Sequence, residues 1–292
     1  MLRGYAGALV GADPFVAAAP RPAVGSMLDV EFAQLSDVGQ SRDHNEDFAG
    51  YVLAATPEQA RSHGWLFVLA DGVGGHEYGE VASQAAVESM VDGFRSAAQG
   101  EPLLSLLPRL VKAANAHVFE TGHAKSSSGS TMATTLVVCA LRYDRAVIAH
   151  VGDSRCYLVR RGHASQLTRD HTLANEQVRL GILLPEEASE TDHSHLLTRS
   201  IGSDLFVSVD ASEHQVFSGD VLVQCSDGMH GSVSASDIAR VAGRDGSLDD
   251  AARELVELAN ELDGSDNITV QLIRVRGVER VGMYRGRPYK LH

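Results

Sequence analysis

Five aspartates lie in tight turns at the ends of apolar, β-branched segments, and their residue type and spacing predict metal chemistry. They are Asp47, Asp71, Asp153, Asp227 and Asp266. A carboxylate at a strand edge costs stability unless something compensates its charge, and five repeats of one arrangement predict a shared partner. A cluster of divalent cations would be such a partner. Oxygen-only ligands suit hard ions such as Mg²⁺ or Mn²⁺ better than they suit zinc.

Each of these aspartates, taken alone, also has a simpler explanation. Asp before Gly or Asn commonly caps a turn by accepting a backbone hydrogen bond. Asp37 could likewise cap the turn that presents Arg42. The metal interpretation therefore depends on the whole set and on elements that bring its members together.

The elements that must position these residues are read from hydrophobic periodicity, which continues from about residue 30 to residue 276. The predicted strands are 30–36, 47–54, 65–70, 131–141, 145–152, 155–160, 205–209, 220–225 and 267–275. The predicted helices are 78–95, 102–122, 170–180, 236–242 and 248–262. Short turns such as LRYDRA and GDSRC predict antiparallel pairing of the strands on either side, because parallel neighbours need long crossovers.

No linker or charge block divides this region, so one domain is expected over 28–276. Residues 1–27 are expected to be a flexible leader and 277–292 an untethered C-terminal tail. Within the domain, 170–205 combines a polar helix with a charged, His-rich stretch, which is typical of a flap over a site. An ordinary surface insertion would have the same composition.

Composition excludes several classes of protein. A net charge of −13 argues against nucleic acid as a partner, because phosphate backbones require clustered Lys and Arg. No apolar run approaches the roughly 18 residues of a membrane span. The three cysteines, Cys139, Cys156 and Cys225, are far apart and form no CxxC pair, so neither a zinc site nor a disulfide is predicted. A cytoplasmic location and a monomer are the simplest expectations.

Eight segments in order resemble the metal-dependent protein Ser/Thr phosphatases of the protein phosphatase 2C type, in their bacterial branch. They are DVGQSRDHNED (37–47), LADGVGGH (69–76), GSTMATTL (129–136), HVGDSRCYL (150–158), LTRDHT (167–172), LTRSIG (197–202), VLVQCSDGMHGSVS (221–234) and GSDNITVQL (264–272). The resemblance implies an α+β fold, a four-layer α-β-β-α sandwich of two antiparallel sheets flanked by helices. It places the metals in a cleft at one edge.

The resemblance also implies roles for particular residues. Asp71 would bridge two Mn²⁺ or Mg²⁺ ions, and the Gly72 carbonyl would ligate one of them. Asp227 and Asp266 would hold the other ion. Glu46 and Asp47 would complete the second ion's shell, directly or through water.

Two further assignments follow from the same resemblance. Asp153 would bind a labile third metal together with Asp227. Arg42 would clamp the substrate phosphate, because a guanidinium offers paired donors that match two phosphate oxygens.

The chemistry implied is hydrolysis of phosphoserine and phosphothreonine by direct attack of a hydroxide that the two metals share. The leaving group needs a proton, and its donor stays open among His44, His76 and metal-bound water. The expected substrates are phosphorylated proteins, and the expected biological partner is a bacterial Ser/Thr kinase with its targets.

Two other functions remain compatible with the same segments. One is a catalytically silent module that binds phosphoproteins, which we would expect to lack one or more of Asp71, Asp227 and Asp266. All three are present. The other is a phosphatase that acts on anti-sigma-factor antagonists, a role often accompanied by sensor regions that this chain lacks.

Overall fold

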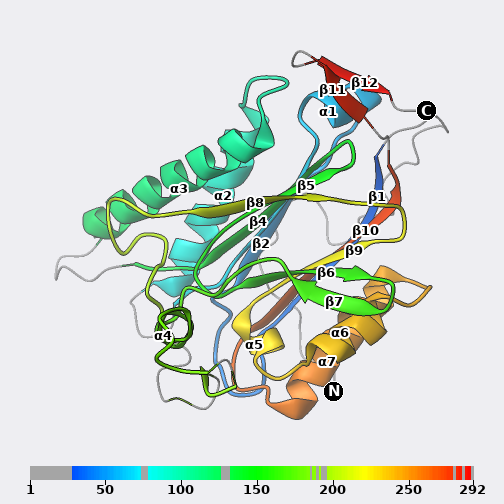
Figure 1. Cartoon of the computed structure of the whole chain (residues 1–292). Coiled ribbons are helices and arrows are strands. Elements are labelled where there is room, and N and C mark those ends of the chain that lie inside the picture. Colours follow the sequence, from blue (N-terminus) through cyan, green and yellow to red (C-terminus); the bar gives the residue numbers. More distant parts are fainter. Residues whose placement is uncertain are drawn as a thin grey trace.

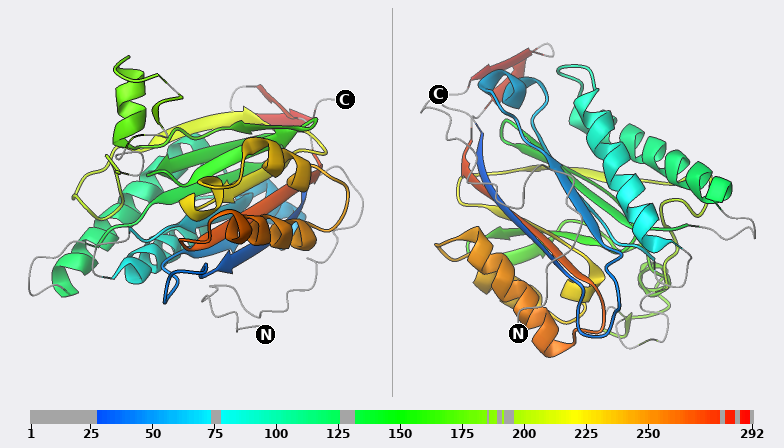
Figure 2. Two further views of the ribbon diagram at one scale, coloured as in Figure 1. Left: turned by 90° about the horizontal axis from the view of Figure 1, so that it is seen from below. Right: turned by 180° about the vertical axis from the view of Figure 1, so that it is seen from behind.

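In the computed structural model, two five-stranded antiparallel sheets pack face to face and helices cover the outer side of each (Figures 1 and 2). The structure describes residues 28–73, 78–125, 132–184, 186–188, 191, 196–278, 281–284 and 287–290. The layers confirm the predicted α-β-β-α sandwich. The expected leader over 1–27 lies outside the described residues.

The first sheet contains strands from both ends of the domain. Its order is β1 (Asp29–Asp37), β10 (Ile268–Gly277), β9 (Val221–Cys225), β6 (Arg155–Arg160) and β7 (His163–Gln166). Its outer face is covered by α6 (Ala235–Ala242) and α7 (Leu248–Leu262). Ser247 caps α7, where its side chain accepts a hydrogen bond from the Asp250 N–H, and the apolar face of this helix is buried against the sheet.

The second sheet is built from the middle of the chain. Its order is β2 (Phe48–Val52), β3 (Trp65–Ala70), β4 (Leu136–Arg142), β5 (Arg145–Val151) and β8 (Asp210–Gln215). The long helices α2 (Gly79–Arg95) and α3 (Leu103–Lys125) cover its outer face.

Four shorter pieces complete the described chain. They are α1 (Pro57–Ser62), α4 (Leu173–Arg179), α5 (Asp227–His230) and a separate hairpin of β11 (Val281–Tyr284) with β12 (Arg287–Lys290). The helix α4 lies inside the predicted flap, and Thr172 caps it by accepting from the Asn175 N–H. The hairpin gives part of the predicted tail regular structure.

Aliphatic side chains fill the space between the sheets, and two further clusters fill the spaces under the helices. Leu66, Phe67, Val68 and Leu69 of β3 are fully buried, so this strand contributes to the cores on both of its faces. Burial on both faces explains why β3 is apolar throughout rather than alternating.

Two predictions about strands are wrong. The strand predicted at 205–209 is a loop in which Phe206 is 86% exposed, and the strand β8 begins at Asp210 instead. β8 is a polar edge strand whose residues alternate between partly buried and exposed. Its polar composition gives no hydrophobic alternation from which the strand could be predicted. The strand predicted over 131–141 begins only at Leu136.

The turn GDSRC does not join paired strands, contrary to the sequence prediction. β5 belongs to the second sheet and β6 to the first, so this turn crosses the edge of the sandwich. Gly152 permits the crossing because its φ is +103° and an added Cβ would lie 2.7 Å from the Thr135 side chain. The other turn, LRYDRA, does join antiparallel neighbours, with Arg142 opposite Arg145.

Candidate active site

In the second sheet, antiparallel pairing brings two of the five aspartates to the same edge. Phe48 at the start of β2 lies opposite Ala70 at the end of β3. Asp47 precedes β2 and Asp71 follows β3. Both therefore leave the sheet at the same end.

The first sheet repeats this arrangement. Cys225 at the end of β9 lies opposite Val270 near the start of β10. Asp227 follows β9 and Asp266 precedes β10. An added Cβ on Gly228 would lie 3.4 Å from the Asp266 Cβ, so the two turns are in direct contact.

Asp47 joins the ends of the two sheets. Its Oδ2 accepts a hydrogen bond of 2.8 Å from the Ser226 hydroxyl, which follows β9. Its Oδ1 is buried and has no hydrogen-bond partner. Burial raises the pKa of Asp47 to about 7, the charge of Asp227 adds to the shift, and hydrogen bonds from Thr269 and Ser226 oppose it.

Asp71 lies among like charges. Its backbone is fixed, because its N–H donates to the Thr135 hydroxyl at 3.1 Å and its carbonyl accepts from the Thr135 N–H at 2.8 Å. Burial, followed by the charges of Asp47, Asp227 and Asp153, raises the pKa of Asp71 well above its ordinary value. Four carboxylates from four separate turns thus interact at this edge.

Asp153 lies in the turn that crosses between the sheets. Burial, together with the charges of Asp227 and Asp170, raises its pKa to about 8. Its backbone carbonyl accepts a hydrogen bond of 3.0 Å from Nε2 of His230, at the end of α5. Burial lowers the pKa of His230 to about 3, so this imidazole is neutral and carries one N–H, which donates to the Asp153 carbonyl.

A basic side chain contacts Asp266. Nη2 of Arg42 donates to its Oδ2 at 2.7 Å, and both side chains are partly exposed. The Asp266 Oδ1 accepts from the Asn267 N–H at 2.8 Å. Asp37 performs the simpler role considered for it, since its Oδ1 accepts from the Gly39 N–H and caps the turn before Arg42.

Glu46 and Gly72 lie beside this group. The Gly72 N–H donates to the Glu46 carbonyl at 3.2 Å, and a Cβ on Gly72 would lie 2.7 Å from the Gly79 carbonyl, so only glycine fits. Oε1 of Glu46 lies 3.1 Å from Nε2 of His44, and Glu80 is close to both. His76, the other candidate proton donor, lies outside the described residues.

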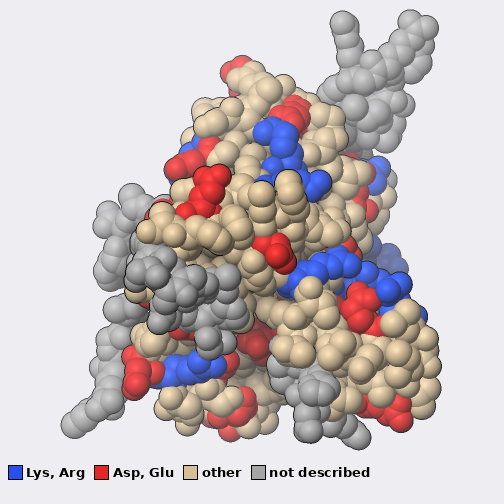
Figure 3. Space-filling view, turned by 90° about the vertical axis from the view of Figure 1, so that its left-hand side faces the viewer, with Lys and Arg blue, Asp and Glu red and all other residues tan. Residues whose placement is uncertain are grey.

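The donors at this edge fit divalent metal ions. Asp47, Asp71, Asp153 and Asp227 offer only oxygen, and the Asp47 Oδ1 is buried without a partner. Their mutual repulsion is the situation that a cation relieves, because it stabilises the ionised form of each carboxylate. Oxygen donors of this kind suit Mg²⁺ and Mn²⁺. Figure 3 shows acidic side chains in a hollow near the centre of the face on which α4 lies.

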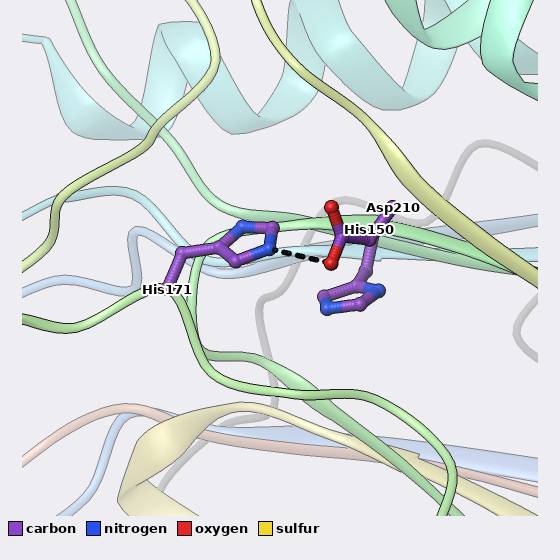
Figure 4. Close-up of side chains that lie close together, drawn as sticks. All are labelled: His150, His171 and Asp210. Atoms are coloured by element: carbon purple, nitrogen blue, oxygen red, sulfur yellow. Dashed lines mark ion pairs between the residues drawn. The ribbon is translucent and has the colours of Figure 1, made fainter. Parts of the chain in front are cut away.

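A second cluster, which the sequence did not single out, lies nearby at the base of the flap (Figure 4). Its members are His150, His171 and Asp210, whose ligand atoms lie within 4.8 Å of one another. The two imidazole rings stack with centroids 4.8 Å apart, and Nε2 of His171 lies 3.5 Å from Oδ2 of Asp210. Burial lowers the pKa of both histidines, to about 4 in His171.

Arginine already supplies the positive charge in this second cluster. Nη1 of Arg199 lies 2.9 Å from Asp210 Oδ1 and 3.2 Å from His171 Nε2. Nη2 of Arg169 lies 3.4 Å from Asp210 Oδ2. The cluster therefore links His171 and Arg199, both within the segment 170–205, to Asp210 at the start of β8.

Sequence reasoning missed Ser226 and His230, although both lie in a segment that it singled out. Ser226 immediately precedes Asp227, and a hydroxyl in that place is a visible signal. His230 could not be distinguished from a surface histidine, because the carbonyl that it contacts is 77 positions away.

Comparisons with known proteins agree with this geometry. A family model described as "Protein phosphatase 2C" matches residues 43–243. Protein phosphatase PhpP of Streptococcus pneumoniae is 33% identical over 252 residues, which cover 84% of this chain and 97% of PhpP.

Solved structures show the same similarity. The serine/threonine phosphatase of S. agalactiae has a TM-score of 0.75 and 36% identity, covering 85% of this chain and all of that one. The catalytic domain of PstP in complex with two manganese ions has a TM-score of 0.70 and 32% identity, covering 84% of this chain and 98% of that one.

Proposed function

This chain belongs to the protein phosphatase 2C family, and we propose that the edge where its two sheets meet is the catalytic centre of a metal-dependent phosphatase. The chain is a protein-serine/threonine phosphatase, so its substrates are phosphorylated proteins. The proposal assigns the residues that bind metal and phosphate. The observation that carries it is that Asp47, Asp71, Asp153 and Asp227, from four separate turns, lie close enough at one edge for their charges to interact.

Two Mn²⁺ or Mg²⁺ ions would be held by the oxygen donors of this edge. Asp71 would serve both ions, the Gly72 carbonyl would ligate one of them, and Asp227 with Asp266 would hold the other. Glu46 and Asp47 would complete the second ion's shell, directly or through water. Asp153 and Asp227 would hold a third, weaker ion. When bound, the ions supply an activated water and offset charge on the phosphoryl oxygens. The two manganese ions bound to PstP support this assignment.

The protein itself contributes a phosphate-binding cation. Arg42 lies at the rim with its side chain 41% exposed, and only one of its terminal nitrogens has a hydrogen bond to Asp266 within the described residues. The remaining N–H groups are available to bind phosphate oxygens in a planar, two-pronged geometry. Arg42 would orient the phosphate and stabilise its charge during transfer.

His44 is the described candidate for the proton donor to the leaving serine or threonine oxygen. Its side chain is 64% exposed, so it can approach a bound phosphoprotein. Its Nε2 lies 3.1 Å from Oε1 of Glu46, so the imidazole is held close to the proposed metal ligands.

The cellular setting is also proposed. The enzyme would oppose a bacterial Ser/Thr kinase in the cytoplasm and act as a monomer, without nucleic acid or membrane as a partner. Three buried cysteines without a disulfide suit a reducing compartment. In the described part of the chain, no helix has both the length and the apolar character of a membrane span.

The test is hydrolysis by the purified protein. It should hydrolyse p-nitrophenyl phosphate and a phosphothreonine peptide with Mn²⁺ or Mg²⁺ and stop when EDTA removes the metal. Activity that survives complete chelation would contradict the metal mechanism.

A further inference from the structure

The segment 38–46 carries Arg42, His44 and Glu46 but contains no helix or strand. Its conformation therefore depends on contacts with the rest of the protein. Within the described residues, the turn 263–267 supplies several of these contacts. The Gln40 N–H donates to the Gly264 carbonyl at 2.8 Å, and a Cβ on Gly39 would lie only 2.2 Å from the Asp266 carbonyl oxygen.

The Asn267 side chain makes three hydrogen bonds to this segment. Its Nδ2 donates to the carbonyls of Val38 and His44, both at 3.0 Å. Its Oδ1 accepts from the Glu46 N–H at 2.8 Å. Asn267 is only 4% exposed, so water cannot replace these bonds.

The geometry requires an amide at this position. Two carbonyls need donors and one N–H needs an acceptor, and among side chains of this length only Asn offers two donors and an acceptor on one planar group. Aspartate would keep the acceptor but would turn a negative oxygen toward two carbonyl oxygens. The bonds at Val38 and His44 are on opposite sides of Arg42 in sequence, so together they set where the guanidinium emerges.

We propose that Asn267 is a positioning residue that presents Arg42 to the substrate phosphate. This inference rests on the proposed function, because it assigns Arg42 to phosphate binding. Asn267 touches no reacting atom in this scheme. Its contribution is to hold segment 38–46 so that the arginine is oriented before substrate arrives, which matters because a displacement of about 1 Å can cost about 10²-fold in rate.

The chain contains a matched control in Asn115 of α3. Asn115 is 1% exposed, and its Nδ2 donates to the carbonyls of Asp204 and Leu205 at 2.9 and 3.1 Å. Its Oδ1 accepts from the Gly202 N–H at 2.9 Å. The chemistry equals that of Asn267, but the loop that it holds carries none of the proposed metal or phosphate ligands.

The experiment compares Asn267→Asp with Asn115→Asp in the full chain. For each variant the Mn²⁺ affinity, the thermal midpoint, kcat and KM for p-nitrophenyl phosphate and the inhibition constant of inorganic phosphate are measured. Both substitutions should lower the thermal midpoint. Only Asn267→Asp should weaken phosphate binding. It should raise the inhibition constant of inorganic phosphate and the KM for p-nitrophenyl phosphate by about tenfold, while Mn²⁺ affinity changes by less than about threefold.

A double-mutant cycle with Arg42→Ala tests whether Asn267 affects phosphate binding through Arg42. If Asn267 acts through Arg42, Asn267→Asp adds little to the phosphate defect of Arg42→Ala. The proposal is overturned if the two asparagine variants shift the phosphate constants alike, or if Mn²⁺ affinity falls as much as phosphate affinity. It is also overturned if neither Asn267→Asp nor Asn267→Ala folds, because the residue would then hold the fold itself. If the proposed function itself is wrong, the wild-type protein will show no metal-dependent hydrolysis, which is a different result.

Discussion

Arg42 and Asp266, 224 positions apart in the sequence, form an ion pair of 2.7 Å at the rim of the acidic edge. One partner is a proposed phosphate ligand and the other a proposed metal ligand. Asp266 would hold a metal ion with the same carboxylate that Arg42 contacts, so metal binding would weaken the ion pair and leave more of the guanidinium for phosphate. The pair therefore connects the two halves of the proposed chemistry.

The first prediction concerns the carboxylates. Asp71→Asn and Asp227→Asn should each lower metal-dependent turnover about 10³-fold or more, because an amide oxygen ligates a hard cation poorly and offsets none of its charge. Asp263→Asn, at an exposed position beside the same turns, should retain activity.

The same variants make a prediction about stability. In EDTA near pH 8, Asp71→Asn should be more stable than the wild type, because burial and the charges of three neighbouring carboxylates disfavour the ionised form that Asp71 takes in the unfolded chain. The thermal midpoint should rise by about 2 °C or more. A lower midpoint in EDTA would show that the Asp71 carboxylate stabilises the fold without metal.

A second prediction concerns the phosphate ligand. Arg42→Ala should lower kcat/KM about 10²-fold, and Arg42→Lys should recover only part of this loss, because an ammonium is a point charge without the planar fork. Arg109→Ala removes a comparable exposed ion pair, with Glu101 at 2.9 Å, and should leave kcat/KM unchanged. Equal kinetics for Arg42→Ala and Arg109→Ala would remove Arg42 from the mechanism.

The third prediction is a pH dependence of stability in the metal-free protein. Folding raises the pKa of Asp47 to about 7 and that of Asp153 to about 8, from 3.8. Between pH 6.5 and 8.5 the folded protein still holds part of these protons, whereas the unfolded chain has already lost them. The free energy of unfolding should therefore fall as pH rises through this window.

The histidines make the free energy of unfolding rise with pH rather than fall, but they do so at lower pH. His171 and His230 have folded pKa values of about 4 and about 3, so they lower stability only as pH falls below 6.5, where the unfolded histidines take up protons. Thermal unfolding from pH 6.5 to 8.5 isolates the carboxylates. Mn²⁺ should remove or reverse the decline, because it binds the deprotonated groups. A metal-free protein that gains stability over this range contradicts the prediction.

The fourth prediction separates leaving groups. The serine or threonine oxygen needs a proton as it departs, whereas nitrophenolate is stable without one. His44→Gln should therefore lower kcat for a phosphothreonine peptide about tenfold or more and change kcat for p-nitrophenyl phosphate little. An equal effect on both substrates would mean that His44 does not donate this proton. His123→Gln, a partly exposed histidine of α3, serves as the control.

The sequence alone was enough to predict the sandwich and to single out the carboxylates that the structure brings together, for a physical reason. The apolar character of a segment is a local property, and strands such as β3 and β5 are apolar over enough residues to show it clearly. Turns that end such strands in Asp-Gly or Asp-Asn are equally visible. Eight such segments in a fixed order carried the family resemblance.

Tertiary structure decided what depends on residues far apart in the chain. β8 escaped detection because a polar edge strand has no apolar signature, and GDSRC was misread because a short turn does not reveal whether the chain changes sheets. The hydrogen bonds of Asn267 and the ion pair of Arg42 with Asp266 likewise join positions more than 220 residues apart. Sequence determines which groups the chain carries, whereas their distances, burial and pKa values exist only once antiparallel pairing has brought the strand ends together.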